Sequence, residues 1–253
     1  MRFVKFEKDG NVARIIFNRP EVGNAFNGEM LREIKEIAEK LASDDDVRVV
    51  ILEGEGKHFC TGGDLRWMRE MARSEYSENY KDALLLFDTY AAVENIPVPT
   101  IAKVKGAVRG GGLGFVSACD IAISAKSSTF SFSEVKIGMV PSVVSSFAIR
   151  KIGYRNARRL FLTAEIFDAY KAKEINLIDE VVDDESLDGK VDEIVKLILS
   201  NKPMAVRKTK ELLRFYKPYF SENFRELTAH ILATTRMGRE ALEGFEDFLK
   251  GKG

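Results

Sequence analysis

Cysteine is scarce in this sequence. Its 253 residues include two cysteines, Cys60 and Cys119, which lie far apart and in apolar company. No Cys-x-x-Cys pair and no Cys/His ligand spacing occurs, so we expect no zinc site. Because disulfide frameworks need more cysteines than this, the composition indicates a reducing compartment and predicts a cytoplasmic protein.

A net charge and long apolar runs are also missing. Lysine and arginine together number 39, as do aspartate and glutamate, so no strong electrostatic field favours nucleic acid or an anionic membrane. The N-terminal segment MRFVKFEKDG has no apolar signal core, and no apolar run long enough to cross a membrane follows it. We therefore expect neither a nucleic-acid nor a membrane partner.

Apolar residues at regular spacing are present instead. The segment 27–44 has apolar residues at helical spacing, and it lies between two short apolar segments that predict strands. In all, strands are predicted at 2–7, 12–18, 48–54, 100–106 and 120–126. Because a strand–helix–strand order indicates a crossover with parallel pairing, the sequence predicts an α/β fold. The length suffices for one large domain, or for a core with a smaller appendage.

From about residue 143 the pattern becomes helical. Helices are predicted near 143–152, 155–162, 168–174, 187–200, 203–217, 222–235 and 239–249, with one short strand at 179–183. Large apolar residues gather in the last helices, namely Phe215, Tyr219, Phe220, Phe224, Leu227, Ile231, Phe245 and Phe248. Such a region either packs on another subunit or folds back on its own core, and we favour the first. We divide the chain into a core, residues 1–195, and a helical oligomerisation region, residues 196–253.

Glycines gather in two loops, at 62–63 and 110–112. The second, GGGLG at 110–114, matches neither the spacing of a dinucleotide fingerprint nor that of a phosphate-binding P-loop. A tight turn is one explanation. The other is a backbone N–H group that binds a ligand oxygen. Each loop follows a predicted strand and precedes a predicted helix, so two N–H groups can converge on one carbonyl oxygen, forming an oxyanion hole.

Four ordered segments resemble the enoyl-CoA hydratase/isomerase (crotonase) superfamily. They are NRPEVGNAFN (18–27), HFCTGGDL (58–65), IAKVKGAVRGGGLGFVSACDIAIS (101–124) and FSFSEVKIGMVPS (130–142), and the similarity extends over about residues 3–252. Longer stretches look most like the methylglutaconyl-CoA hydratase-like branch. The resemblance implies a crotonase-like spiral of β-β-α repeats with a helical C-terminal trimerisation region. It also implies a homotrimer or a dimer of trimers.

The same resemblance assigns roles to particular residues. The two N–H groups that would hold the thioester oxygen belong to Gly63 and Gly111, and Asp64 is expected to be a structural cap. Glu134, followed by Gly138 and Pro141, matches the family's catalytic glutamate. Gly114 stands where hydratases of the family often have a second glutamate. One of the two acids is therefore missing.

The resemblance also implies an acyl-CoA substrate. We expect its coenzyme A to be a part of the substrate, with no separate cofactor and no metal. The predicted substrate-binding residues are Gly62, Gly63, Asp64, Leu65, Arg66, Trp67 and Gly111; for Trp67 a place in the core is an equal alternative.

Several reactions fit such a site. Our first prediction is the hydration of a 2-enoyl-CoA, with Glu134 as the only acid and base. The alternative is the isomerisation of a 3-enoyl-CoA to a 2-enoyl-CoA, for which one carboxylate suffices. Hydrolysis, decarboxylation, or acyl-CoA or RNA binding without chemistry stay open, since an oxyanion hole serves several reactions.

Overall fold

A six-stranded sheet forms the frame of the molecule in the computed structural model, which describes residues 1–215 and 223–251. Its strand order is β1-β2-β3-β4-β6-β9. The strands are β1 (Val4–Asp9), β2 (Val12–Phe17), β3 (Val49–Gly54), β4 (Thr100–Val104), β6 (Ile121–Ala125) and β9 (Glu180–Val182). Only the hairpin of β1 and β2 is antiparallel, so the predicted α/β class with parallel pairing is confirmed.

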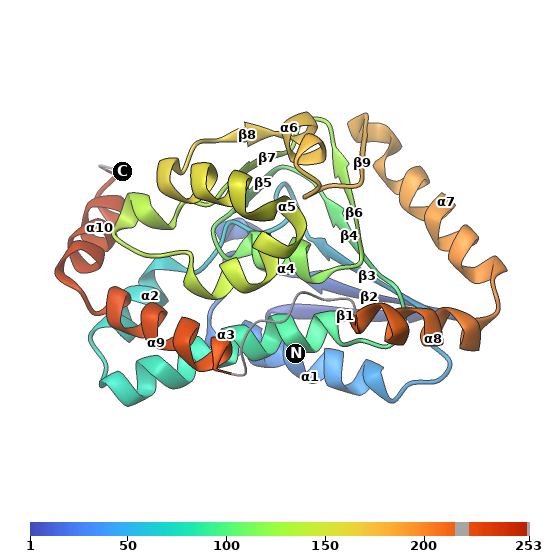
Figure 1. Cartoon of the computed structure of the whole chain (residues 1–253), viewed down its shortest axis with the longest axis horizontal. Helices are drawn as coiled ribbons and strands as arrows, with labels where there is room; N and C mark the ends of the chain where they lie inside the picture. The colour runs from blue at the N-terminus through green and yellow to red at the C-terminus, as the bar shows by residue number, and fades with distance from the viewer. Residues whose placement is uncertain (216–222, 252–253) are drawn as a thin grey trace.

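A second, three-stranded sheet lies beside the first and consists of β5 (Ala107–Arg109), β7 (Thr129–Ser131) and β8 (Phe167–Asp168). Cys60 extends it by a parallel bridge to Val108. The chain thus passes from a strand of the first sheet to one of the second and then into a helix, repeatedly. This is the expected spiral of β-β-α turns (Figure 1). The sequence did not reveal these strands, because segments of two or three residues show no periodicity.

Helices pack around the sheets, and the short helix α4 lies at the centre of the molecule (Figure 1). In the first half of the chain they are α1 (Gly28–Ala42), α2 (Leu65–Ala72), α3 (Tyr76–Glu94) and α4 (Gly112–Ala118). The helix α5 (Ser142–Thr163) is interrupted at Gly153, whose φ of 73° is not helical, which agrees with the two shorter helices predicted there. The helix α6 is Ala169–Glu174. The short 3-10 helices are η1 (Pro20–Val22), η2 (Glu134–Ile137) and η3 (Asp184–Ser186).

Helix α7 (Leu187–Ser200) belongs to the core rather than to a separate region. Its Leu187, Val191 and Val195 are buried against Val49 of β3 and Ile123 of β6, among others. The predicted boundary at residue 195 therefore falls inside this helix. Helix α8 (Pro203–Arg214) follows, and its Lys210 reaches the Val98 carbonyl at 2.9 Å.

Helices α9 (Phe224–Arg236) and α10 (Arg239–Leu249) fold back on their own chain. Arg225 of α9 forms a two-pronged ion pair with Asp88 of α3, and Phe245 of α10 is fully buried in the main core. Phe215, in contrast, is 82% exposed, and Leu227 and Phe248 are half exposed. Tyr219 and Phe220 lie outside the described residues. Some apolar C-terminal residues are thus buried in the core of their own chain, and others are exposed and available to another subunit. Oligomerisation stays a prediction.

No helix among the described residues has both the length and the apolar character needed to span a bilayer.

Candidate active site

A cavity of about 1130 Å³ opens between the two glycine loops, η2, the start of α5 and the C-terminal helices. Every residue that the sequence assigned to the site lines it. These are Gly62, Gly63, Asp64, Leu65, Arg66, Trp67, Gly111 and Glu134. The structure thus brings together residues from positions 62 to 134.

The first glycine loop is held in place by a bridge to Phe26. The Phe26 N–H donates to the Gly62 carbonyl at 2.8 Å, and the Asp64 N–H donates to the Phe26 carbonyl at 2.7 Å. In such a parallel bridge the intervening residue, Gly63, directs its own N–H away from Phe26. Gly62 has a φ of 96°, and a Cβ there would lie 2.9 Å from the Arg109 carbonyl oxygen, so the turn requires glycine.

The second glycine loop meets the first one. A Cβ on Gly62 would lie 3.7 Å from the Gly111 nitrogen. Gly110 donates its N–H to the Ser131 carbonyl, and Gly111 is the N-cap residue of α4. Because N–H groups at the start of a helix have no carbonyl partner within it, the Gly111 N–H is free for a ligand. The N–H groups of Gly63 and Gly111 therefore border the same space.

Asp64 fixes the end of the first loop. Its Oδ1 accepts a hydrogen bond from the Arg66 N–H at 3.0 Å and so caps α2, in the role expected for it. Its Oδ2 accepts from Nη2 of Arg19 at 2.8 Å, and Arg19 also donates to the Ala25 carbonyl. With both oxygens engaged, Asp64 positions the loop rather than reacting.

Glu134 is the carboxylate nearest the second loop. A Cβ on Gly110 would lie 3.3 Å from its Oε1, while its Oε2 is buried without a hydrogen-bond partner among the described residues. Burial raises the pKa of Glu134 to about 7, and a backbone hydrogen bond offsets only part of this effect. Such a carboxyl can both take and return a proton near neutral pH.

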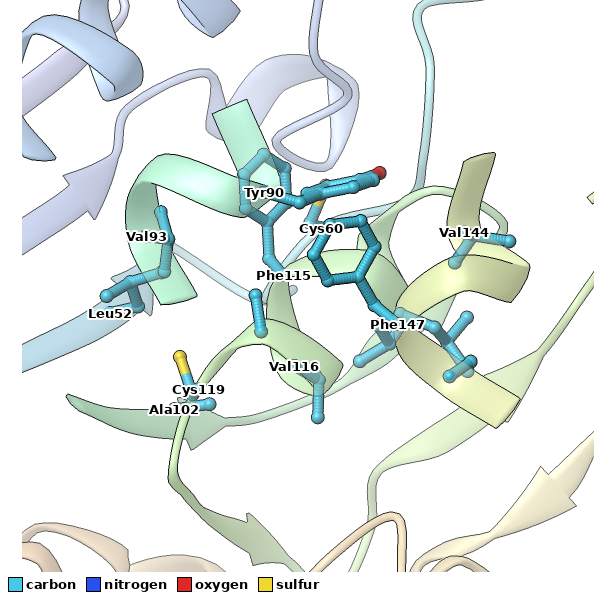
Figure 2. Packing of buried hydrophobic residues seen from close by; sticks show 14 of the residues in the cluster. Leu52, Cys60, Tyr90, Val93, Ala102, Phe115, Val116, Cys119, Val144 and Phe147 are labelled. Carbon is cyan, nitrogen blue, oxygen red and sulfur yellow. The ribbon is translucent and has the colours of Figure 1, made fainter. Parts of the chain in front are cut away.

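The position of the missing second glutamate is filled by an aromatic ring. A Cβ on Gly114 would lie 2.3 Å from Cζ of Tyr90, so no side chain fits there. The buried Tyr90 packs edge-to-face on Phe115 and Phe147 and donates its hydroxyl to the Gly111 carbonyl at 2.5 Å. Figure 2 shows these rings together among the buried residues. Burial raises the pKa of Tyr90 well above its usual range, so the hydroxyl keeps its proton.

Two further residues of the cavity were not assigned to the site from the sequence, although one of them, Phe26, lies in the segment 18–27. Phe26 lies behind the second loop, since a Cβ on Gly111 would be 2.6 Å from its Cζ. Arg236 lies over Trp67 at 5.3 Å and is held by Asp82 at 2.7 Å. Both reach the cavity by long-range folding, and only their contacts identify them.

Other acids contribute little to the cavity. Besides Glu134 and the paired Asp64, the only carboxylate among the described lining residues is the exposed Asp247. In the described part of the chain, no group of three or more His, Cys, Asp or Glu residues is placed to hold a metal ion. The described lining thus offers the backbone of two glycine loops and, beside the second loop, the carboxyl of Glu134.

Comparisons with known proteins find similarity along nearly the whole chain. The family profile of enoyl-CoA hydratase/isomerase matches residues 7–251. A short-chain-enoyl-CoA hydratase from Clostridium acetobutylicum is 31% identical over 258 residues, covering 96% of this chain and 98% of the relative. A peroxisomal Delta(3,5)-Delta(2,4)-dienoyl-CoA isomerase from Arabidopsis thaliana is 32% identical and covers 84% of this chain and 81% of its own. The crystal structure of an enoyl-CoA hydratase from Shewanella pealeana is similar to this one with a TM-score of 0.82 at 34% sequence identity. The match covers 99% of this chain and 94% of the Shewanella chain.

Proposed function

Because this chain belongs to the enoyl-CoA hydratase/isomerase family, and is an enzyme of that family, we propose that it adds water to the double bond of a 2-enoyl-CoA thioester. The observation that supports this most directly is Glu134. The residue is partly exposed, but its Oε2 is buried without a hydrogen-bond partner among the described residues, and its pKa is raised to about 7. Glu134 lies beside Gly110, the residue that precedes the proposed donor Gly111.

The reaction follows from that arrangement. The thioester oxygen accepts hydrogen bonds from the Gly63 and Gly111 N–H groups, which draws electrons from the conjugated double bond. Glu134 takes a proton from water, and the hydroxide adds to Cβ while the π electrons move toward the thioester oxygen. The protonated Glu134 then delivers its proton to Cα. Water is thus divided between Cβ and Cα, and Glu134 returns to its starting form.

Isomerisation is the second candidate, and the single carboxylate favours it. With no second buried acid among the described lining residues, Glu134 can remove a proton from one carbon of a 3-enoyl chain and return it two carbons away. The same two N–H groups would stabilise the dienolate formed between these steps.

Coenzyme A enters the proposal as the substrate's handle, with no cofactor of its own. The exposed Arg66 and Lys136 line the mouth of the cavity and offer positive charge to the phosphates of such a ligand. We further propose a cytoplasmic trimer or dimer of trimers, since large apolar side chains such as Leu162, Leu213 and Phe215 are exposed.

Ultraviolet absorbance of the conjugated thioester distinguishes the two reactions. Purified protein is offered crotonyl-CoA and, separately, 3-hexenoyl-CoA. Loss of conjugation from crotonyl-CoA, with 3-hydroxybutyryl-CoA as the product, supports hydration. Gain of conjugation from 3-hexenoyl-CoA without any loss from crotonyl-CoA would replace our first proposal by the second.

A further inference from the structure

We infer that Tyr90 is a positioning residue for the oxyanion hole, and that it excludes a second carboxylate from the reacting carbons. The inference rests on the proposed function, because it concerns how the same site is held. Tyr90 lies on α3, outside both glycine loops, and has no exposed surface. Its hydroxyl contacts Gly111, and its ring would meet any side chain at residue 114.

The hydroxyl acts on the peptide that follows the Gly111 donor. It donates to the Gly111 carbonyl at 2.5 Å, and the Gly114 N–H donates to the same carbonyl at 3.0 Å. With two donors on one oxygen, the peptide plane between residues 111 and 112 cannot rotate freely. The Gly111 N–H lies in the preceding peptide, whose Gly110 carbonyl accepts from the Leu113 N–H at 3.0 Å. With the peptide planes on both sides of the Gly111 Cα held, this N–H is kept facing the cavity, which is the preorganisation that an oxyanion hole needs.

The ring itself is held from several sides. Its centroid lies 4.8 Å from that of Phe115 and 5.3 Å from that of Phe147, both edge-to-face. Figure 2 shows Tyr90 in this cluster, with its hydroxyl directed out of the ring packing. Because the ring is fixed on α3, its hydroxyl holds the Gly111 carbonyl at a fixed distance from this helix. The second glycine loop therefore cannot shift without disturbing the aromatic packing.

The same ring decides what residue 114 can be. Three atoms of Tyr90 would lie between 2.3 and 2.7 Å from a Cβ on Gly114, closer than any real contact. An acidic side chain at this position would therefore need a smaller residue at position 90. Tyr90 and Gly114 form a matched pair, and the pair leaves Glu134 as the only buried carboxyl among the described lining residues that is free to react.

Tyr90→Phe tests the positioning role, since it removes the hydroxyl and keeps the ring. We expect kcat to fall by about tenfold or more, less than the roughly 100- to 1,000-fold typical of losing an oxyanion donor. The KM and the dissociation constant for butyryl-CoA should stay within about twofold, because the ground state gains little from the hole. Tyr76→Phe is the control. It removes a hydroxyl of the same helix, bonded to His230 at 2.9 Å, and should leave kcat unchanged.

A spectroscopic measurement separates this role from general stability. Crotonyl-CoA bound to the Glu134→Gln protein should absorb at a longer wavelength than in water, because the hole polarises its carbonyl. Adding Tyr90→Phe should reduce that shift, and adding Tyr76→Phe should not. An unchanged shift together with a wild-type kcat in Tyr90→Phe would overturn the inference. If the wild type hydrates nothing while the shift responds to Tyr90, the proposed reaction fails and the positioning role stands.

A pair of variants tests the steric part. Gly114→Ala should lower kcat and thermal stability, and Tyr90→Ala combined with Gly114→Ala should recover part of both relative to the sum of the single changes. Strictly additive effects would show that the two positions do not constrain each other.

Discussion

The carboxylate of Glu134 lies against Gly110, so close that a Cβ there would stand 3.3 Å from Oε1. Gly110 immediately precedes Gly111, whose N–H is the second donor of the proposed hole. The proposed base and the proposed donor therefore lie at adjacent points of the second glycine loop. In the proposed reaction, a thioester oxygen bound at Gly111 would bring its Cα and Cβ near Glu134, which is the condition for proton transfer.

The support of Glu134 by α10 yields the first prediction. A Cβ on Gly244 of α10 would lie 2.6 Å from the Ile137 carbonyl oxygen, at the end of the 3-10 helix that begins with Glu134. Gly244→Ala should therefore displace this segment and lower kcat by about 10- to 100-fold. The control is Gly189→Ala, also within a helix but with open space around it, which should stabilise the protein by about 0.5–1 kcal/mol at unchanged kcat. Equal kcat in both variants would contradict the coupling.

Two aspartates with the same local role yield the second prediction. Asp64 caps α2 and Asp168 caps α6, so replacing either by Ala should cost about 0.5–2 kcal/mol of stability. Only Asp64 also holds Arg19, at 2.8 Å, beside the first glycine loop. Asp64→Ala should lower kcat by about tenfold or more, whereas Asp168→Ala should not. Urea unfolding and crotonyl-CoA turnover measure the two effects separately.

The third prediction concerns the pH dependence of turnover. Glu134 must be deprotonated to act as the base, and its pKa in the free enzyme is about 7. The value of kcat/KM for hydration should therefore rise with pH and reach half of its plateau near pH 7. An ordinary exposed carboxyl would place this midpoint near 4.5, and such a profile would show that Glu134 is not the group whose ionisation limits the reaction.

The fourth prediction concerns stability. The folded-state pKa of Glu134, about 7, lies above its ordinary value of 4.5, so the folded protein binds the extra proton between these two pH values. Stability from this group is thus lost as pH rises from about 4.5 to 7, by up to about 3 kcal/mol. Glutamine does not ionise, so the Glu134→Gln variant does not lose stability in this way. Relative to wild type, the variant should gain free energy of unfolding between pH 5 and pH 8, measured by urea denaturation. A constant difference would contradict the buried, unpaired state of the carboxyl.

The sequence predicted much of this site because the key residues follow local rules. Glycines 62–63 and 110–112 each come between a strand and a helix, and Asp64 directly precedes an apolar helical segment, so their placement was foreseeable. Tyr90 and Arg236 were different. Each reaches the cavity or its wall from a helix or loop remote in sequence, through packing that no short-range pattern encodes. The boundary predicted at residue 195 falls within α7, whose Leu187, Val191 and Val195 pack with β3 and β6, and the division into two regions stays a prediction.

The central claim is that a single carboxyl, Glu134, moves the proton. The most direct test compares kcat for crotonyl-CoA hydration in wild type, Glu134→Gln and Asp247→Asn, the last being the exposed carboxylate that also lines the cavity. We predict a loss of about 100- to 10,000-fold for Glu134→Gln, unchanged butyryl-CoA binding, and wild-type turnover for Asp247→Asn. Turnover by Glu134→Gln within a few fold of wild type would contradict the claim.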